Sequence, residues 1–545
     1  MRSSWLVLLM GSACAHSELP SPRFRNADPV HAVNDERDVP RPPKRRKDWS
    51  KLYDFDGSVR RPLTRPLELK AHRRALGVNA LDEVPDSTWF TNRIGVRDLS
   101  PDDIENGPLT IESPATHLPW TVLGIKSEGV SLGLFVNDAR GERFLIKFDA
   151  KGFPELQTAA HVIVDRLLWA YGYNVTEDFI AYVRRSDLQI APNAVWTDAE
   201  GKTRRLDQAD LTARLDTVDL GRDGRIRVLA SRWLAGRALG GHPGEGVRDD
   251  DPNDRIPHQL RRDLRGELPI FAWLDSTDIK ETNTLDMWIV DPSAPDRHFV
   301  RHYLLDFGNS LGAMAMLQHD PTRGYEYSLD YERMFTSLVS VGLQPRAWAD
   351  RDAPPIVGVG LFEQTLDPAK WKPSTPAYQP LLETDRYDWL WGAKILIRFT
   401  PEQLRAAVLA GQLSDPRATA YLTRTLAIRQ RAVAEYAFSR VRPFDNFKID
   451  NTQSLCFDDL MITYGFVDRS GYTIAAYDFG GRKLGAYTAR STADGHFCTG
   501  ALPLSRARDG YTIIGIRGDT PGNTYVHVAR DRATSALRVI GIWRE

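Results

Sequence analysis

Hydrophobic and polar positions change their spacing along the chain, and these changes predict three folded regions. In the first region, apolar residues recur at helical spacing from Glu155 to Tyr171, with Pro154 and Gly172 at the two ends of the expected helix. Strand-like runs lie on both sides of it. We expect these strands at residues 121–136, 142–148 and 226–233, with a turn at 137–141 between the first two.

The second region combines a pair of strands with several helices. The spacing predicts a helix from His258 to Leu274 with a kink at Pro269, because an internal proline removes a backbone hydrogen bond. Mostly helical spacing then extends from about residue 330 to residue 440. The other elements expected here are a Gly-, Pro- and Asp-rich loop at 236–257, strands at 285–290 and 298–305, and helices at Pro401–Leu409 and Arg417–Val441.

After Pro443 short apolar runs alternate with Gly, Asp and Asn turns, which predicts a small all-β domain at 443–545 that resembles a β-sandwich. The strands are expected at 460–467, 472–478, 511–516 and 524–528. Cys456 and Cys498 both lie in this region. In an exported protein they can form a disulfide, and the alternative is two separate buried thiols.

The N-terminus has the character of a targeting segment rather than of a fold. Arg2 precedes the apolar run Trp5–Met10, and small residues stand directly before Cys14. This pattern resembles a bacterial lipoprotein signal at 1–14, although Gly11 occupies a position where Leu is usual. The resemblance implies export to the bacterial cell envelope and acylation of Cys14, which would anchor the chain to a membrane. A plain cleaved signal and a chance apolar start are the alternatives.

Residues 15–80 contain many prolines and few large apolar residues. Such a segment buries too little surface to offset the entropy of ordering it. We therefore expect an extended or disordered tether. The basic run Lys44–Lys47 is expected to be a solvated charge cluster, and contact with lipid head groups is the alternative.

Composition narrows the classes of function. The chain has 545 residues, which favours two to four domains. Lys and Arg number 71 and Asp and Glu 72, so the net charge of −1 provides no overall attraction to nucleic acid. Three cysteines exclude a disulfide-framework protein and a Cys-rich zinc protein. After the first fifteen residues no apolar run is long enough to span a bilayer.

The residues that indicate chemistry lie between 271 and 308. Asp278 precedes Asn283 by five positions, the separation found in the protein-kinase catalytic loop H-R-D-x-x-x-x-N. Asp306-Phe307-Gly308 follows a short apolar strand, which would place a carboxylate at a strand end. Phosphoryl transfer needs such a set: a carboxylate to orient the attacking hydroxyl, and an amide and a second carboxylate to hold Mg²⁺.

A lysine that neutralises phosphate charge is also needed, and Lys147 lies in an apolar strand upstream. An inward-facing lysine requires an anionic partner, which ATP phosphates or Glu155 on the next helix can supply. The preceding hairpin contains small residues, Gly129 and Ser131 among them, that would let backbone N–H groups approach phosphates.

Each of these motifs alone is usually structural, and their order is what favours a shared site. The remaining candidates favour structural roles. His302 and the run Trp389–Trp391 are expected in the core or an interface, and Asp249–Asp251 in a solvated turn. His242, His258 and His319 lack ligand spacing, so no zinc site is predicted.

Residues 271–283 resemble the catalytic loop of HipA-type serine/threonine kinases, which carry a similar F-x-W-L…T-D…N run, and Leu167–Val175 resembles the end of a helix in the same family. The chain is also similar to a group of uncharacterised bacterial lipoproteins with no established substrate. The resemblance to the protein-kinase-like superfamily covers about 110–440. It implies a two-lobed fold of class α+β, with an N-lobe at 81–235 and a C-lobe at 236–442.

The resemblance also implies roles for individual residues. Lys147 would contact ATP phosphates, Asp278 would be the catalytic base, and Asn283 and Asp306 would bind Mg²⁺. Two features depart from the family: Ile279-Lys280 follows the base, and the gap from Asn283 to Asp306 is long.

The acid that pairs with the lysine is also unusual. Glu155 falls early in its helix, and His161 occupies about the position of the family's acid.

Two functions follow as hypotheses. The first is an envelope-anchored transferase that moves a phosphoryl or nucleotidyl group from ATP to an unknown hydroxyl acceptor. The alternative is a catalytically inactive scaffold of the same fold, which presents its β domain to an envelope partner. Export motivates this alternative, because free ATP is scarce outside the cytosol.

Overall fold

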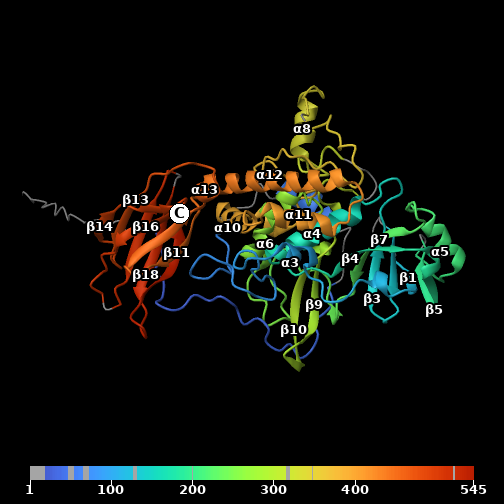
Figure 1. Cartoon of the computed structure of the whole chain (residues 1–545), viewed down its shortest axis with the longest axis horizontal. Coiled ribbons are helices and arrows are strands. Elements are labelled where there is room, and N and C mark those ends of the chain that lie inside the picture. Colours follow the sequence, from blue (N-terminus) through green and yellow to red (C-terminus); the bar gives the residue numbers. More distant parts are fainter. Residues whose placement is uncertain are drawn as a thin grey trace, which may run out of the picture. The chain divides into compact units, whose positions relative to one another are not determined.

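The protein, described by a computed structural model, consists of helices and several separate sheets and belongs to the α+β class. The structure describes residues 19–46, 55–64, 73–126, 132–198, 201–314, 320–346, 348–507, 509–519 and 522–545. Contacts divide the chain into two compact units (Figure 1). The C-terminal unit comprises 439–545, 80–82 and the described residues up to Pro29; the large unit comprises the described residues of 30–79 and 83–438.

A seven-stranded sheet forms one part of the large unit, in the order β4-β7-β3-β2-β1-β5-β6. Neighbouring strands are antiparallel except for the parallel pair β1 and β5. Trp120, Phe144 and Val228 are completely buried in its core. The strands are β1 (Trp120–Ile125), β2 (Gly133–Asn137), β3 (Arg143–Lys147), β4 (Asp178–Val183), β5 (Leu188–Thr197), β6 (Thr203–Arg205) and β7 (Ile226–Arg232).

The strand expected at 121–136 is therefore two strands, β1 and β2, which pair with each other. The turn expected at 137–141 joins β2 to β3, where Asp138 Oδ1 accepts hydrogen bonds from the N–H groups of Arg140 and Glu142. The expected strand at 226–233 is β7. Helix α5 (Gln208–Leu215) buries Leu211 and Leu215 against the same core.

Helix α4 (Leu156–Tyr171) follows β3 and is almost completely buried. The carboxylate of Asp149 caps its first turn: it accepts from the N–H groups of Gln157 (2.8 Å) and Thr158 (2.9 Å) and from the Thr158 hydroxyl (2.7 Å). The helix ends at Gly172, as expected, with φ of 147°. A side chain there would meet the ring of Phe90, so both backbone and space require glycine.

The helix expected at 258–274 is broken, and the break is not at Pro269. The segment forms η5 (His258–Leu260), α6 (Arg262–Arg265) and α7 (Glu267–Leu274). Pro269 is the third residue of α7, where its missing N–H has no intrahelical partner to lose. The breaks lie at Arg261, whose backbone is extended, and at Gly266, where a Cβ atom would be 2.2 Å from the ring of Trp391.

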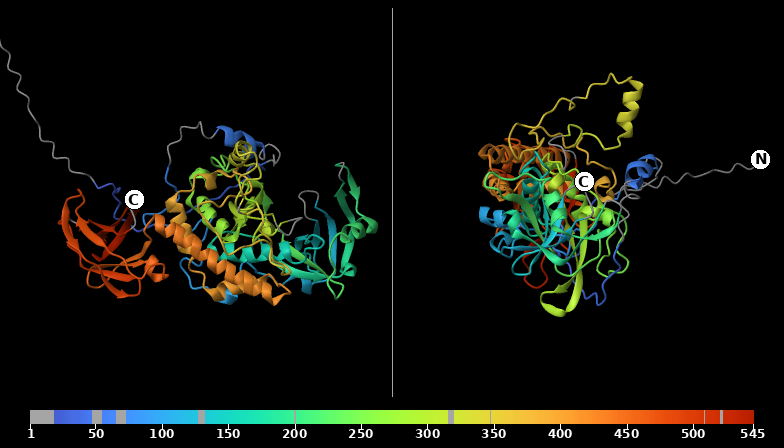
Figure 2. Two further views of the ribbon diagram at one scale, coloured as in Figure 1. Left: turned by 90° about the horizontal axis from the view of Figure 1, so that it is seen from above. Right: turned by 90° about the vertical axis from the view of Figure 1, so that its right-hand side faces the viewer.

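The rest of the large unit contains a small sheet, in the order β10-β9-β8, and several helices. The segment that carries α8 (yellow) stands away from the neighbouring helices (Figure 2). None of the described helices is long and apolar enough to cross a membrane. The elements are β8 (Arg237–Ala238), β9 (Thr284–Asp291), β10 (Ala294–Leu304), α8 (Tyr331–Val339), α9 (Gln379–Leu382), α10 (Arg386–Leu396), α11 (Pro401–Ala410) and α12 (Pro416–Arg440), with shorter pieces η1 (Asp56–Arg60), α2 (Arg61–Thr64), α3 (Pro101–Asn106), η3 (Pro114–Thr116) and η4 (Arg185–Asp187).

The C-terminal unit contains two antiparallel sheets, in the orders β11-β12-β16-β15 and β14-β13-β17-β18-β19. Side chains of both sheets, such as Phe457 and Ile514, share one buried core. Cys456 and Cys498 face each other on β12 and β16 and are joined by a disulfide. The strands are β11 (Phe444–Ile449), β12 (Ser454–Asp459), β13 (Thr473–Tyr477), β14 (Lys483–Tyr487), β15 (Arg490–Ala493), β16 (His496–Ala501), β17 (Thr512–Arg517), β18 (Asn523–Arg530) and β19 (Leu537–Arg544).

The strand expected at 460–467 is wrong, because residues Leu460–Thr463 form the one-turn helix α13. Asp459 accepts a hydrogen bond from the N–H of Met461 (3.0 Å) and caps this turn, and Gly465 ends it with a positive φ. The expected strands at 472–478, 511–516 and 524–528 correspond to β13, β17 and β18.

Residues 19–46 have no regular helix or strand but are not unpacked, which corrects the expectation of a tether for this part. Ser21 is buried, and its hydroxyl lies 2.7 Å from His527 Nε2 in the C-terminal unit. In the large unit, Val39 is buried and accepts a hydrogen bond from Trp288 Nε1 (2.8 Å). Arg46, from the basic run, forms an ion pair with Glu281 (2.7 Å) instead of being fully solvated. Amino-acid composition could not indicate these contacts, because the partners of Ser21, Val39 and Arg46 lie far away in the sequence.

The cap of α4 gives a test of this arrangement. We expect Asp149→Ala to lower the free energy of unfolding by about 2 kcal/mol, because three N–H groups and one hydroxyl lose their acceptor. Asp149→Asn keeps one acceptor oxygen and should lose less. Urea unfolding of both variants measures the difference. Asp207→Ala, at the exposed cap of α5, is the control with a smaller expected loss, and an Asp149→Ala variant as stable as the wild type would contradict the assignment.

Candidate active site

Helix α7 provides a rigid base for the loop that carries Asp278. The indole of Trp273 donates to the carbonyl of Leu426 on α12 (2.8 Å). The guanidinium of Arg429, also on α12, donates to the carbonyls of Ala272 (2.7 Å) and Trp273 (2.9 Å). These carbonyls belong to the last turn of α7, where a cation is favourable. The position of the following loop is therefore fixed by α12.

The loop is closed by the two residues that the sequence singles out. Asn283 Nδ2 donates to the backbone carbonyl of Asp278 (2.7 Å), which explains why a separation of five positions is needed. The Asp278 carboxylate forms an ion pair with Lys280 Nζ (2.9 Å) and accepts a hydrogen bond from Asn309 Nδ2 (3.3 Å). The N–H of Leu305 donates to the carbonyl of Asn283 (2.8 Å), which joins the loop to the segment after β10.

Asp306 follows β10 in a left-handed backbone conformation, with φ of 63°, that is uncommon outside glycine. Its Oδ1 lies 2.8 Å from Nζ of Lys147 on β3. Burial alone would raise the pKa of Asp306, but the charges of Lys147 and His161 lower it, and the net pKa is well below the usual value. The side chain is still 48% exposed, so the carboxylate is ionised and accessible to a ligand.

Asp278, Asn283 and Asp306 line one small recess, together with Lys280, Glu267 and Tyr378. Lys147 contacts the Asp306 carboxylate of this recess. The structure thus brings together four polar residues that are distant in sequence. The long gap between Asn283 and Asp306 is the β9–β10 hairpin, whose strands pair from Thr284 to Leu304.

Helix α4 does not supply an acid to Lys147. His161, at about the expected position, forms a hydrogen-bonded ion pair with Asp178 (2.8 Å), and its ring packs on Phe307. Burial raises the pKa of Asp178, but the charge of His161 and hydrogen bonds more than offset this and leave the pKa lowered. The helix is therefore connected to the Asp306 segment through aromatic packing and through Gln157, whose amide donates to Asn309 Oδ1 (3.1 Å).

Glu155 is not the partner of Lys147, which corrects one expectation. Its backbone is left-handed, and its carboxylate accepts a hydrogen bond from the N–H of Ser414 (2.8 Å). In the described part of the chain it does not line the recess with Asp306. Gly129, Ser131 and Cys14 lie outside the described residues.

Three residues that contribute to the site were missed or misjudged from the sequence. Lys280 departs from the family's pattern, but its ammonium pairs with the Asp278 carboxylate. Asn309 holds the same carboxylate, and its place three residues after Asp306 was the available signal. Arg323 donates to the hydroxyl of Thr277 (2.8 Å) and to the carbonyl of Asn309 (3.1 Å), and no local pattern indicated it.

The residues assigned structural roles are mostly buried. Trp389, Leu390 and Trp391 lie in the core. His302 is also buried, but in a polar network with His242 and His258, so these histidines are not scattered as expected. Asp251 is buried as well, which corrects the expectation of a fully solvated turn. His319 lies outside the described residues.

In comparisons with known proteins, no family model matches this chain and no curated protein matches it.

The Lys147–Asp306 pair predicts a specific pH dependence. Because the pKa of Asp306 is lowered in the folded protein, the pair stabilises the fold above the unfolded pKa of about 4, and this contribution is lost as the pH falls below it. We expect Lys147→Met to weaken the acid dependence of the unfolding free energy below pH 4, measured by urea unfolding at several pH values.

Lys280→Met is the matched control for this measurement, because Lys280 pairs with Asp278 and not with Asp306. It should leave the acid dependence assigned to Asp306 in place. Equal effects of the two variants would show that Lys147 does not govern the ionisation of Asp306.

Proposed function

We propose that the protein is an ATP-dependent phosphotransferase of the protein-kinase-like superfamily, which moves a phosphoryl or nucleotidyl group to a hydroxyl acceptor. The observation that carries this proposal is the recess shared by Asp278, Asn283 and Asp306, with Lys147 bound to Asp306. In this proposal the seven-stranded sheet with α4 corresponds to an N-lobe, the helices after it to a C-lobe, and the C-terminal unit to a β-sandwich.

Each residue has a role that its position favours. The Asp278 carboxylate accepts the proton of the acceptor hydroxyl while the hydroxyl oxygen bonds to phosphorus and the bond to the leaving group breaks; this group is ADP in phosphoryl transfer and pyrophosphate in nucleotidyl transfer. Asn283 and Asp306 are oxygen ligands of the type that Mg²⁺ prefers. Lys147 neutralises phosphate charge. Lys280, 2.9 Å from Asp278, adds a second positive charge beside the reacting groups.

The connection of elements also supports this proposal. The lysine strand β3 is followed by α4, and the loop with Asp278 precedes the β9–β10 hairpin that leads to Asp306. Strand β3 lies inside the sheet between β2 and β7, so Lys147 is held by partners on both sides, Gly133 and Leu229. This order of parts matches the resemblance to HipA-type kinases.

Export to the envelope and lipid anchoring at Cys14 remain part of the proposal on the strength of the N-terminal sequence alone. The disulfide between Cys456 and Cys498 supports an oxidising compartment. The acceptor would then be a hydroxyl-bearing molecule of the envelope.

Nucleotide binding tests the proposal directly. We expect Mg²⁺ with ATP to raise the melting temperature of the full chain, and Asp306→Asn to abolish this shift because the metal loses a ligand. Asp278→Asn should keep the shift but lower phosphoryl transfer from labelled ATP about 10²–10⁴-fold, since it removes the base. Thermal shift and transfer to envelope extract are the two measurements.

Asp296→Asn, an exposed aspartate at the far end of β10, is the matched control and should behave as the wild type. A wild-type protein whose melting temperature does not respond to ATP with Mg²⁺ or Mn²⁺ would contradict the proposal.

A second candidate is a catalytically inactive scaffold of the same fold. The observation that favours it is the direct Lys147–Asp306 pair combined with His161 at the position of the usual acid, because Lys147 and Asp306 already satisfy each other's charge. An envelope partner retained equally by the wild type and by Asp278→Asn and Asp306→Asn, with no transfer from ATP, would support the scaffold over the enzyme.

A further inference from the structure

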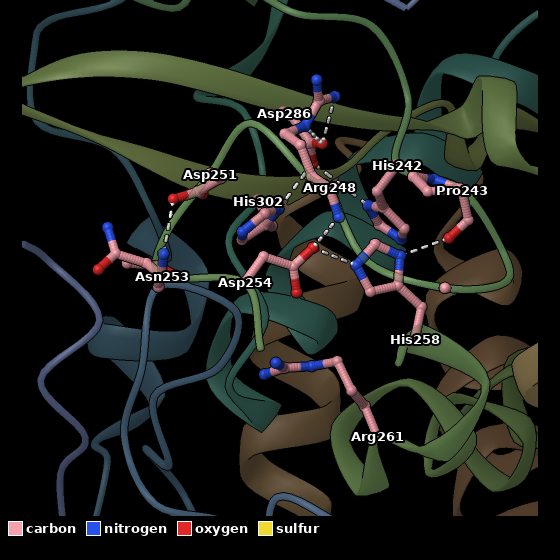
Figure 3. A network of polar contacts seen from close by, with 12 residues as sticks. His242, Pro243, Arg248, Asp251, Asn253, Asp254, His258, Arg261, Asp286 and His302 are labelled. Carbon is pink, nitrogen blue, oxygen red and sulfur yellow. Dashed lines mark hydrogen bonds and ion pairs between the residues drawn. The ribbon is translucent and has the colours of Figure 1, made fainter. Parts of the chain in front are cut away.

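Three histidines that are far apart in sequence meet in one buried network of the large unit (Figure 3). His242 lies in the loop after β8, His258 begins η5, and His302 is on β10. At most 4% of each residue is exposed. The indole of Trp89 stacks on His302 with ring centroids 3.4 Å apart, which closes one side of the network.

Asp286 on β9 lies between two of these histidines. Its Oδ1 is 2.6 Å from His302 Nδ1 and 3.5 Å from His242 Nδ1. One ligand atom from each of His242, Asp286 and His302 lies within 4.8 Å of the others. Two imidazole nitrogens and one carboxylate oxygen are a donor set suited to zinc and similar transition metals, and poorly suited to Mg²⁺ or Ca²⁺.

The surroundings of His242 Nδ1 favour a bound cation. The atom is fully buried, and the nearest acceptor to it is Asp286 Oδ1 at 3.5 Å, which is longer than a good hydrogen bond. Its other nitrogen, Nε2, lies 2.8 Å from the Tyr378 hydroxyl. If Nε2 carries the proton, the lone pair of Nδ1 faces the Asp286 carboxylate, which is repulsive. A cation between the two groups turns this repulsion into attraction.

We propose that His242, Asp286 and His302 bind a divalent transition-metal ion of the zinc class, which fastens the 239–258 loop to the β9–β10 hairpin. The inference does not depend on the proposed transferase activity.

The geometry requires little rearrangement. Ligands of tetrahedral zinc lie about 3.3 Å apart at usual bond lengths, so the 3.5 Å between Asp286 Oδ1 and His242 Nδ1 already fits. The 2.6 Å contact between Asp286 and His302 is a hydrogen bond, and the ion would replace its proton while the two atoms separate slightly. A closed, buried position is typical of structural rather than catalytic metal sites.

Neighbouring residues hold the proposed ligands in place through hydrogen bonds. Arg248 donates two hydrogen bonds to Asp286 Oδ2 (2.8 and 3.0 Å) and leaves Oδ1 toward the histidines. Tyr378 fixes one nitrogen of His242, and the N–H of His242 donates to the Thr284 hydroxyl (3.1 Å). Such partners orient metal ligands and hold the histidine tautomer.

The buried network contains more negative than positive side chains, which favours binding of a cation. Among the buried groups described here, the carboxylates of Asp251, Asp254 and Asp286 outnumber the guanidinium of Arg248, and Arg261 is paired with Asp263.

The metal content of the intact protein tests this inference. The full chain, without a histidine tag, is produced with zinc in the medium, dialysed and analysed by mass spectrometry. We expect about one equivalent of metal per chain, and a Co²⁺-substituted sample should show the absorption of tetrahedral cobalt. His242→Ala and Asp286→Asn should each reduce the metal content at least about tenfold.

Two variants serve as controls. His258→Ala removes a buried histidine of the same network that pairs with Asp254, and His496→Ala removes the histidine beside the Cys456–Cys498 disulfide. Both should keep the metal. Only variants with the circular dichroism spectrum of the wild type are compared. As a second measurement, we expect removal of the metal by a chelator to lower the melting temperature of the wild type.

Folded wild-type protein with less than about a tenth of an equivalent of any transition metal, and with no cobalt spectrum, would overturn the inference. The same follows if folded His258→Ala or His496→Ala loses metal as completely as His242→Ala. Loss confined to His242→Ala and Asp286→Asn supports the assigned ligands.

Discussion

The ion pair between Lys147 and Asp306 is the contact on which the geometry of the candidate site depends. It joins the middle of the seven-stranded sheet to the segment after β10, across 159 positions of sequence. Because the Asp306 side chain is 48% exposed, screening by water limits what the pair adds to the stability of the fold. Its importance lies in position: it holds Lys147 against Asp306, which lines one recess with Asp278 and Asn283, and no local pattern around either residue would bring the two together.

The same pair constrains which ligands the recess can accept. Both charged groups are satisfied in the structure, so a metal ion alone would displace the ammonium of Lys147, and a phosphate alone would take Lys147 from Asp306. Either event leaves a partly buried charge without its partner, which is unfavourable. A phosphate together with a divalent ion replaces both partners at once. Under the proposed function, the resting ion pair would therefore favour a metal–nucleotide complex over either component alone.

The four main site residues could be predicted from the sequence because each is tied to a local pattern. Asp278 and Asn283 are five positions apart, and the structure shows why, since one side chain closes the loop on the backbone of the other. Asp306 comes two residues after β10, and Lys147 is the last residue of β3. Their assembly was predictable only from the order of these patterns. The prediction that Glu155 pairs with Lys147 was wrong, because closeness in sequence does not decide which way the start of α4 faces. The Glu155 carboxylate instead accepts a hydrogen bond from the N–H of Ser414.

What the sequence could not reveal depends on contacts between distant segments. The histidine network has no ligand spacing because each member comes from a different element, and the N-terminal segment looks unpacked because its contacts lie on surfaces formed much later in the chain.

The packing of the N-terminal segment changes the anchoring hypothesis. Ser21 is buried in the C-terminal unit, so only six residues separate it from Cys14. Even fully extended, that length spans about 20–25 Å. If Cys14 carries lipid, the C-terminal unit is held close to the bilayer, and the long flexible reach expected of a tether is not available to it.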